Sequence, residues 1–493
     1  MAGKALILVE NLSVPFDRRV WQECTALRDA GWTVHVICPQ GTTRDTEPEV
    51  VLDDVHIHRY PLRPATGGPL GYLREYGMAL LHTRRLARVV GPVDVVHACN
   101  PPDLFFLLAR RWKRKGARFV FDQHDLVPEL YLSRFGRGKD FLYRAVCWLE
   151  RRTYRAADVV IATNESYRQA ALDRGGKRPD QVFVVRSAPK VERFRQVAPE
   201  ARLKKGKPYL LCYLGVMGPQ DGVDYALRAL AKLRDEQGRT DWHAAFVGAG
   251  DTFEQMKALA VELGLADSVD FTGRISDEDL LRYLSTADVC LAPDPLNPLN
   301  DVSTMNKIME YMAMSRPIVS FDLREARVSA GDAAVYATAN DESEFAKLTA
   351  ALLDAPELRQ RMGEIGRARV AGPLSWDRSR EALVAAYEAA YYKGASGVPR
   401  PRTDTTALVR APERGPGAPA AQQRPAAVQD EDGQVAADIQ RAYLTARDER
   451  NEGARTQPTL GGGAAEGGEL PVADPHPHTP SKIGGNRASG THE

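Results

Sequence analysis

The stretch DVSTMNKIMEYMAMSRPIV, residues 301–319, decides the fold because it links two buried strands through a short helix. The strand Val289 to Ala292 precedes it, and the run PIVSF begins the next strand at its end. A strand, a helix and a second strand in this order indicate a parallel α/β sheet. Helical spacing also gives the helix two sides. One is a stripe of methionine and isoleucine, and the opposite, polar side is formed by Ser303, Asn306, Lys307 and Glu310.

The polar side of this helix predicts a ligand site. The helix follows the end of a strand, where open α/β sheets bind phosphorylated ligands. Unpaired amides of its first turn favour an anion by about 0.3–1 kcal/mol. Glu310 lies further inside, where a carboxylate is suited to accept both hydrogen bonds of a ribose diol. The alternative is a solvated helix face on which Lys307 and Glu310 form a pair three residues apart.

Short apolar runs alternate with helix-length stretches along most of the chain. Residues 4–190 contain six strand-like runs: ALILVE, WTVHVICP, DVVHACN, RFVFDQH, DVVIATN and VFVVRSA. Residues 208–372 contain six more: YLLCYLG, WHAAFVGAG, SVDFTG, DVCLAPD, PIVSFD and AAVYA. This alternation predicts two Rossmann-like, doubly wound α/β domains, at 1–190 and 208–372. Residues 375–393 add a terminal helix.

The composition supports two domains and a tail. The chain has 493 residues, of which 43% are hydrophobic, enough for two sizeable cores. Residues 394–493 are rich in Pro, Gly, Ala, Thr and charge and poor in large apolar side chains. We expect this tail to be disordered, apart from a transient helix around 438–451.

Cysteines and apolar runs point to a reducing compartment. The six cysteines form no CxxC pair and fall mostly in apolar runs, so we expect reduced core residues. A strand begins at Lys4 with no signal peptide before it, and no apolar run reaches the roughly 20 residues that span a bilayer. We therefore expect a cytoplasmic protein, with room for peripheral attachment to the inner face of the cell membrane.

The charge is balanced overall but uneven along the chain. A net charge of +1 argues against nucleic acid as a main partner. Residues 1–190 hold 30 Lys and Arg against 21 Asp and Glu, and the rest of the chain offsets this excess. The first domain is therefore the basic one.

Tandem doubly wound domains that face each other form the GT-B fold, and the local sequences agree with one family. The chain resembles the bacterial family 4 retaining glycosyltransferases, or glycosyl transferases group 1, over about residues 1–393. Four stretches carry the resemblance: NLSVPFDRRVWQECTALRDAGWTVHVICP, FDQHDLVPELY, YLGVMGPQDGVDYALRAL and NKIMEYMAMSRPIV. The resemblance implies a nucleotide diphosphate sugar as donor, held by the second domain, with no obligatory metal or cofactor. It also implies that the terminal helix crosses back onto the first domain.

Two features depart from the family pattern. The family helix has two glutamates separated by seven residues, and Glu310 fits the second, ribose-binding position. Val302 stands where the first belongs, with Asp301 as the nearest carboxylate. The family loop G-R-x-x-x-x-K-G here reads GVMGPQDG over residues 215–222, so both of its cations are missing.

The missing cations require a replacement, because the diphosphate develops about two negative charges as it leaves. Lys307 is our candidate, with Arg274 and the pair Arg18 and Arg19 as helpers. Glycines of the loop still permit close backbone approach to a ligand. The candidate donor contacts are Gly215, Gly218, Gly222, Gly248, Arg274, Ile275, Asp301, Ser303, Asn306, Lys307 and Glu310.

Where the family has paired glycines after the first strand, this chain has Asp17, Arg18 and Arg19. Paired arginines are suited to bind donor phosphates or an anionic acceptor such as a lipid diphosphate. Solvation of a charged surface is the alternative.

Two further strand ends of the first domain carry histidines. His124 resembles the family's cleft histidine near the donor sugar, and Asp122 makes its surroundings polar. His97 and Asn100 follow another strand and are candidates for acceptor or phosphate contact. A purely structural role is the alternative for each histidine.

Two other motifs have simpler explanations, and a third kind of motif is absent. Residues 277–279, Asp-Glu-Asp, have the D-x-D form of metal-dependent transferases, but Ser276 before them makes a helix cap the better explanation. Residues 248–251, GAGD, lack the third glycine of a dinucleotide fingerprint. Zinc-ligand spacing is absent, and we expect no metal site.

Residues 134–155, RFGRGKDFLYRAVCWLERRTYR, combine seven basic residues with five aromatic ones. Cations interleaved with aromatics suit an anionic bilayer surface, although ordinary helix packing is a near alternative.

Together with the family resemblance, the features described above predict a retaining glycosyltransferase of cell-envelope or exopolysaccharide assembly, with His124, Lys307 and Glu310 as its central residues. We expect a lipid-linked or polysaccharide acceptor. The rivals are a nucleotide-sugar epimerase of the same architecture and an inactive scaffold.

Overall fold

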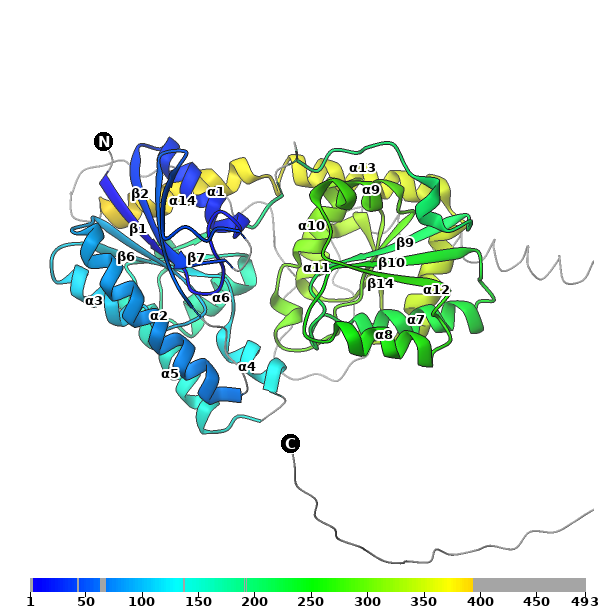
Figure 1. The fold of residues 1–493 in the computed structure, drawn as a ribbon, viewed down its shortest axis with the longest axis horizontal. Helices are drawn as coiled ribbons and strands as arrows, with labels where there is room; N and C mark the ends of the chain where they lie inside the picture. Colours follow the sequence, from blue (N-terminus) through cyan, green and yellow to red (C-terminus); the bar gives the residue numbers. More distant parts are fainter. Residues whose placement is uncertain are drawn as a thin grey trace, which may run out of the picture. The chain divides into compact units, whose positions relative to one another are not determined.

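The computed structural model describes residues 3–41, 44–62, 68–135, 138–189, 191 and 193–392. They form two α/β domains, each built on a sheet of its own (Figure 1). This architecture confirms the predicted fold class. The predictions for the tail at 394–493 lie outside the described residues.

The sheet of the first domain has eight strands in the order β3-β4-β2-β1-β5-β6-β7-β8. All neighbours pair in parallel except β3 and β4. The strands are β1 Gly3–Leu8, β2 Trp32–Pro39, β3 Glu49–Leu52, β4 Val55–Tyr60, β5 Val95–Cys99, β6 Arg118–Gln123, β7 Val159–Ala162 and β8 Val182–Val184.

The antiparallel pair is a hairpin that the sequence analysis missed. β3 and β4 are joined by Asp53 and Asp54, whose φ angles of 46° and 56° are left-handed. Aspartate tolerates this region in two-residue hairpin turns. The strand was hard to recognise because β3 lies at the sheet edge and leaves its side chains largely exposed, so it lacks a buried face.

The sheet of the second domain has six parallel strands in the order β11-β10-β9-β12-β13-β14. All six were predicted. The strand order reverses between β9 and β12, the point at which doubly wound sheets bind ligands. The strands are β9 Tyr209–Leu214, β10 Trp242–Val247, β11 Val269–Gly273, β12 Val289–Ala292, β13 Ile318–Phe321 and β14 Ala334–Ala337.

Helices cover both faces of each sheet, as crossover connections between parallel strands require. In the first domain they are α1 Arg18–Asp29, α2 Gly68–Val90, α3 Phe106–Lys113, α4 Val127–Phe135, α5 Phe141–Ala156 and α6 Glu165–Asp173. In the second they are α7 Val223–Asp235, α8 Phe253–Glu262, α9 Asp277–Thr286, α10 Asn306–Ala313, α11 Arg324–Ala330, α12 Glu342–Leu353 and α13 Pro356–Ala371. Short 3-10 turns are η1 Pro179–Gln181, η2 Ala201–Lys204, η3 Asn300–Val302 and η4 Gly331–Ala333.

The last helix, α14 Trp376–Tyr391, packs on the first sheet although it follows the second domain in sequence (Figure 1). Leu383 and Tyr387 are fully buried in the same core as residues of β1, β2 and α1. The Tyr387 ring meets Trp32 edge-on, with centroids 5.2 Å apart. The chain thus passes from the first domain to the second and back.

All six cysteines are free, and only Cys147 is less than buried. Among the described residues, no helix combines the length and apolar character that crossing a membrane requires.

Candidate functional site

Lys307 lies at the centre of a buried charge cluster in the second domain. Its Nζ is 2.6 Å from Asp294 Oδ1 and 4.0 Å from Asp221 Oδ1, and it lies 5.2 Å from the centroid of the Tyr213 ring. Although burial alone would lower it, Asp294 raises the pKa of Lys307, so the side chain is an ammonium ion at neutral pH. Lys307 is 7% exposed, so the alternative of a solvated helix face does not hold for this residue.

The residues 215–222, here called the glycine loop, pack closely against neighbouring segments, and two of these contacts leave no room for a Cβ atom at the glycine concerned. A Cβ on Gly222 would lie 2.0 Å from the Pro293 carbonyl oxygen, and one on Gly248 would lie 1.8 Å from that of Gly215. A Cβ on Gly215 would lie 3.2 Å from Lys307 Cε. The loop therefore lies directly against the lysine, and these predicted donor residues do come together at the ends of β9, β10 and β12.

Asp221 holds the glycine loop from within. Its Oδ2 accepts a hydrogen bond from the Gly218 amide at 2.9 Å, and burial raises the pKa of Asp221 to about 6. Lys307 is thus offset by two carboxylates above that pH. An ammonium ion neutralised in this way cannot alone balance a diphosphate.

Glu310 lies one turn beyond Lys307 on α10. Its side chain is 19% exposed, and Oε1 lies 3.6 Å from a guanidinium nitrogen of Arg18 in the first domain. Burial raises the pKa of Glu310 to about 7, although Arg18 and Arg193 oppose the effect. Arg18 also contacts Asp277 at 3.3 Å. The carboxylate therefore lies where residues from both domains meet.

Of the other predicted donor contacts, two have partners within the protein and two are exposed. Asp301 accepts a hydrogen bond from the Arg324 amide at 2.9 Å, so it caps α11. Ser303 lies before α10 rather than on it, and its hydroxyl donates to the Leu299 carbonyl at 2.8 Å. Asn306 and Arg274 are exposed.

In the first domain, Asp122 at the end of β6 gathers charged partners around His124. His124 Nε2 lies 2.5 Å from Asp122 Oδ2, and Arg19 donates to Asp122 Oδ1 at 2.9 Å. Although burial alone would raise it, Arg19 and His124 hold the pKa of Asp122 well below its usual range. Burial alone would lower the pKa of His124, but Asp122 raises it. Asp122 therefore favours the protonated imidazole, whereas the Arg19 guanidinium, whose Nε lies 3.1 Å from His124 Nε2, opposes it.

The two arginines of the first loop have different surroundings. Arg19 points inward, where it also pairs with Glu23 at 3.0 Å and is 9% exposed. Arg18 is about half exposed and reaches Glu310 and Asp277. Only Arg18 is accessible to a ligand, so the expectation of a paired arginine site needs correction.

Three predicted acceptor contacts are interior residues. His97 is fully buried, with Nδ1 2.9 Å from the Tyr387 hydroxyl of α14. Asn100 Oδ1 accepts from the His124 amide at 2.7 Å, and Asp17 caps α1 by accepting from the Val20 amide at 3.1 Å. These three residues make hydrogen bonds within the protein interior and do not line the surface of the site.

Four side chains of this cluster could offer ligand atoms to a metal, because Glu23, Cys99, Asp122 and His124 present donor atoms within 4.8 Å of one another. The guanidinium of Arg19 already lies between the two carboxylates. A second cation at this place would meet strong repulsion.

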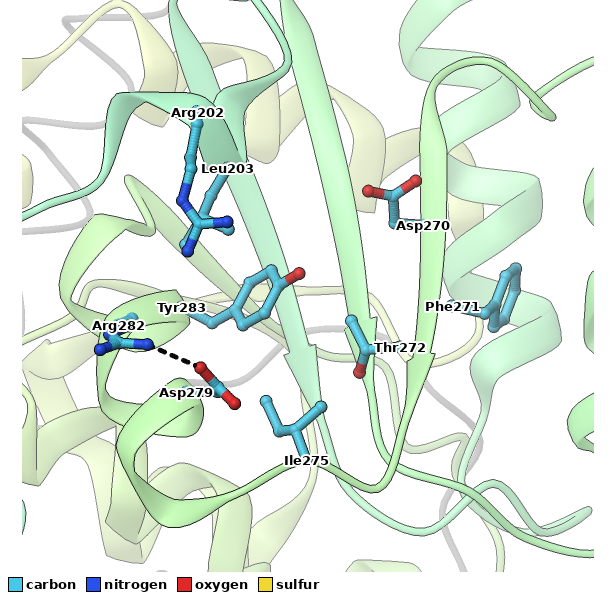
Figure 2. A pocket seen from close by; sticks show the side chains of 9 residues that line it. All are labelled: Arg202, Leu203, Asp270, Phe271, Thr272, Ile275, Asp279, Arg282 and Tyr283. Atoms are coloured by element: carbon cyan, nitrogen blue, oxygen red, sulfur yellow. Dashed lines mark hydrogen bonds and ion pairs between the residues drawn. The ribbon is translucent and has the colours of Figure 1, made fainter.

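A cavity of about 400 Å³ lies at the edge strand of the second sheet (Figure 2). Ile275, a predicted donor contact, lines it, whereas Lys307 and Glu310 do not. Asp279 pairs with Arg282 at 2.9 Å on its wall, and its backbone amide is capped by Ser276 as predicted. The cavity's remaining charges include Asp270, which pairs with Lys205 at 3.3 Å. We assign no reaction to it.

Comparison with known families agrees with this geometry. The family described as "Glycosyl transferase 4-like domain" matches residues 17–188, and "Glycosyl transferases group 1" matches residues 208–355. The chain belongs to the group 1 glycosyltransferases. It is therefore a glycosyl-transferring enzyme, and the matches cover both domains that carry the site.

Individual proteins similar to this glycosyltransferase include the alpha-D-kanosaminyltransferase of Streptomyces kanamyceticus. It is 26% identical over 361 residues, which are 68% of this chain and 88% of the relative. Sucrose-phosphate synthase from Thermosynechococcus elongatus is similar in structure, with a TM-score of 0.64 at 19% identity over 78% of this chain and 98% of that one. HepE of Anabaena, solved with UDP-glucose, has a TM-score of 0.57 at 15% identity over 78% and 98%. These structures establish the GT-B fold of the glycosyltransferase.

Sequence reasoning missed Asp294 and Glu23 and gave Asp122 only a supporting mention. Asp294 and Asp122 stand at the carboxyl ends of β12 and β6, the same signal that identified His124. Glu23 gave no such signal, because it lies inside α1 and only the fold brings it under the site.

Proposed function

We propose that this enzyme transfers a sugar from a nucleotide diphosphate donor to a hydroxyl acceptor with retained anomeric configuration, in cell-envelope or exopolysaccharide assembly. The observation that carries the proposal is Lys307 against the glycine loop, with Glu310 one turn further along α10, at the reversal point of the second sheet. A carboxylate there suits a ribose diol, and close-packed backbone suits a diphosphate. The UDP-glucose bound to HepE, a protein of the same fold, supports this class of donor.

A second cation is needed to balance the charge of the diphosphate, because Asp294 and Asp221 offset the positive charge of Lys307. Arg18 is the accessible candidate, and it already lies 3.6 Å from Glu310. When the ribose hydroxyls engage Glu310, Arg18 is released to face the phosphates. His124, held in place by Asp122, would orient the sugar from the first domain.

The reaction would form a bond between the acceptor oxygen and the anomeric carbon as the bond to the phosphate oxygen breaks. The acceptor proton passes to the departing phosphate oxygen on the same face of the sugar. No residue of the chain and no metal needs to form a covalent intermediate in this scheme. Preorganised cations then supply most of the stabilisation of the transition state.

We place the acceptor, a lipid-linked or polysaccharide intermediate, against the basic first domain. The segment 134–155 supports contact with an anionic membrane, since Phe141 and Trp148 are exposed on α5 beside arginines. Tyr154 of the same segment is buried and belongs to the core.

Donor turnover tests the proposal. A panel of nucleotide-sugars is screened by thermal shift, since ligand at 100 times its dissociation constant stabilises by about 2.7 kcal/mol. The best donor is then incubated with the enzyme, with Glu310→Ala, with Lys307→Ala and with the exposed control Lys347→Ala, in the presence and absence of a chelator. We expect released nucleotide diphosphate from the enzyme and the control, unaffected by chelation, and strongly reduced release from both site variants. Turnover without free nucleotide diphosphate would indicate an epimerase, and no binding or turnover would indicate a scaffold.

A further inference from the structure

Three helices cover one face of the first sheet and share a chemical character. α2, α3 and α5 pack on the core that contains Ala79, Phe106 and Tyr154, and Figure 1 shows them along the same side of this sheet. Their outward sides are here called the basic helical face. α1 and α14 cover the opposite side of the sheet and do not belong to it.

The basic helical face is strongly cationic. Its three helices contain eleven Lys and Arg residues but only two acidic ones, Glu75 and Glu150. Glu150 is buried, so it contributes little to the surface. The exposed cations are Arg74, Arg84, Arg85, Arg88, Arg110, Arg111, Arg144, Arg151 and Arg155.

Large apolar side chains stand among these cations. Phe141 is 81% exposed, Val89 is 73% exposed and Trp148 is 51% exposed. On α2, Met78 and Leu81 line a surface hollow together with arginines 84, 85 and 88. Leu107 of α3 and Leu142 of α5 are exposed as well. Exposed apolar side chains gathered on one face among polar residues are typical of a surface that contacts a membrane or another protein.

We propose that the basic helical face docks on an anionic lipid bilayer, with Phe141, Trp148 and Leu81 entering the interface between headgroups and acyl chains. Cations beside aromatic and aliphatic side chains match the two layers of such a surface. Nucleic acid fits less well, because it offers no apolar layer for Phe141 or Val89. The inference deepens the proposed function and rests on it in placing the enzyme where a lipid-linked acceptor would be, and it widens the contact from 134–155 to α2 and α3.

Electrostatic attraction and the insertion of apolar side chains into the bilayer make separate contributions to the affinity for membranes. Each arginine near an anionic surface strengthens binding about fivefold, and salt at about 1 M screens most of this attraction. The apolar side chains contribute a part that salt does not remove.

Sedimentation of the full chain with vesicles tests the proposal without donor or acceptor. Vesicles are pure phosphatidylcholine or equal parts phosphatidylcholine and phosphatidylglycerol. We expect binding to the anionic vesicles at about 0.1 M salt and a large loss at about 1 M. Arg84→Gln, Arg85→Gln and Arg88→Gln together should weaken binding about a hundredfold. The matched control, Lys207→Gln, Lys257→Gln and Lys347→Gln, removes the same charge from the second domain and should bind like the parent.

Brominated lipids report insertion directly. Trp148 fluorescence should be quenched in anionic vesicles, and Trp148→Phe should lose most of the quenching. Equal losses in the two triple variants, equal binding to neutral vesicles, or binding to a short DNA duplex but not to vesicles would overturn the proposal. Because these experiments measure no catalysis, failure of membrane binding can be distinguished from failure of donor turnover.

Discussion

At the scale of single residues, the charge state of Glu310 decides how the donor is held. Burial raises the pKa of Glu310 to about 7, above the ordinary value of 4.5, so the free enzyme is partly protonated there at neutral pH. A carboxylate accepts hydrogen bonds from both hydroxyls of a diol, whereas in the protonated acid one of the two oxygens carries a proton and becomes a donor. Between pH 6 and 8 the ionised fraction rises from about a tenth to about nine tenths, so donor affinity should rise about tenfold.

Titration calorimetry with the donor at several pH values measures this dependence, and Glu310→Gln is its control. The variant should bind about ten- to a hundredfold more weakly above pH 8 and show a flatter profile. The raised pKa of Glu310 also affects the stability of the fold. The folded state binds the proton more tightly than the unfolded state does, and this contribution to the free energy of unfolding is complete below about pH 4.5 and is lost as the pH rises through 7. Urea unfolding of Glu310→Gln should lack this decline. A parent profile that is flat from pH 6 to 8 would contradict the assignment.

Asp122 is expected to act through His124 and Arg19 rather than on the substrate. Asp122→Asn should lower the pKa of His124, move the acidic limb of the pH–rate profile and reduce kcat about ten- to a hundredfold, with a smaller change in donor KM. Cys99→Ala, in the same buried cluster but without charge, is the control for packing. A shift in melting temperature with an unchanged pH profile would show that Asp122 has only a structural role.

Single residues were the hardest part of the site to predict. His124 was found because it follows a strand end, and Glu310 because it lies on the polar side of a helix at the family's second glutamate position. The burial of Lys307 was not, because helical periodicity does not show that Asp294 and Asp221, from two other loops, would meet it.

At the scale of elements, the glycine loop owes its shape to close backbone contacts. Gly222 and Gly238 have similar φ angles of 69° and 63°, but only Gly222 faces another backbone, because a Cβ there would lie 2.0 Å from the Pro293 oxygen. Gly238→Ala should therefore cost only the left-handed strain, about 1–2 kcal/mol. Gly222→Ala should cost more, because the loop must also move, and donor binding should fall with it. Urea midpoints and donor affinities of the two variants measure the difference, and equal effects would contradict it.

Strands that form continuous apolar runs were predictable from sequence. The six strands of the second sheet, and β1, β2, β5, β6, β7 and β8 of the first, follow from apolar runs between helix-length segments. The hairpin of β3 and β4 was missed because β3 has no buried stripe and because the buried strand β4 contains His56, His58 and Arg59 instead of a continuous apolar run. Helix α10 begins at Asn306 and not near Asp301, because η3 occupies residues Asn300–Val302.

At the scale of the whole molecule, α14 makes the stability of the first domain depend on residues far along the chain. Its apolar side enters the core beside Trp32, and Tyr387 reaches His97 beneath the candidate site. The first domain therefore cannot complete its core until the second domain has been synthesised.

Leu383→Ala tests this dependence against Glu388→Ala, an exposed residue of the same helix. Leu383 is fully buried, so its truncation should destabilise the first domain by about 2–5 kcal/mol, whereas the control should change stability by less than about 0.5 kcal/mol. Calorimetry should show the loss in the transition of the first domain, while the second domain melts as before. If both transitions fell together, α14 would be stabilising the molecule as one cooperative unit, and its assignment to the first core alone would be wrong.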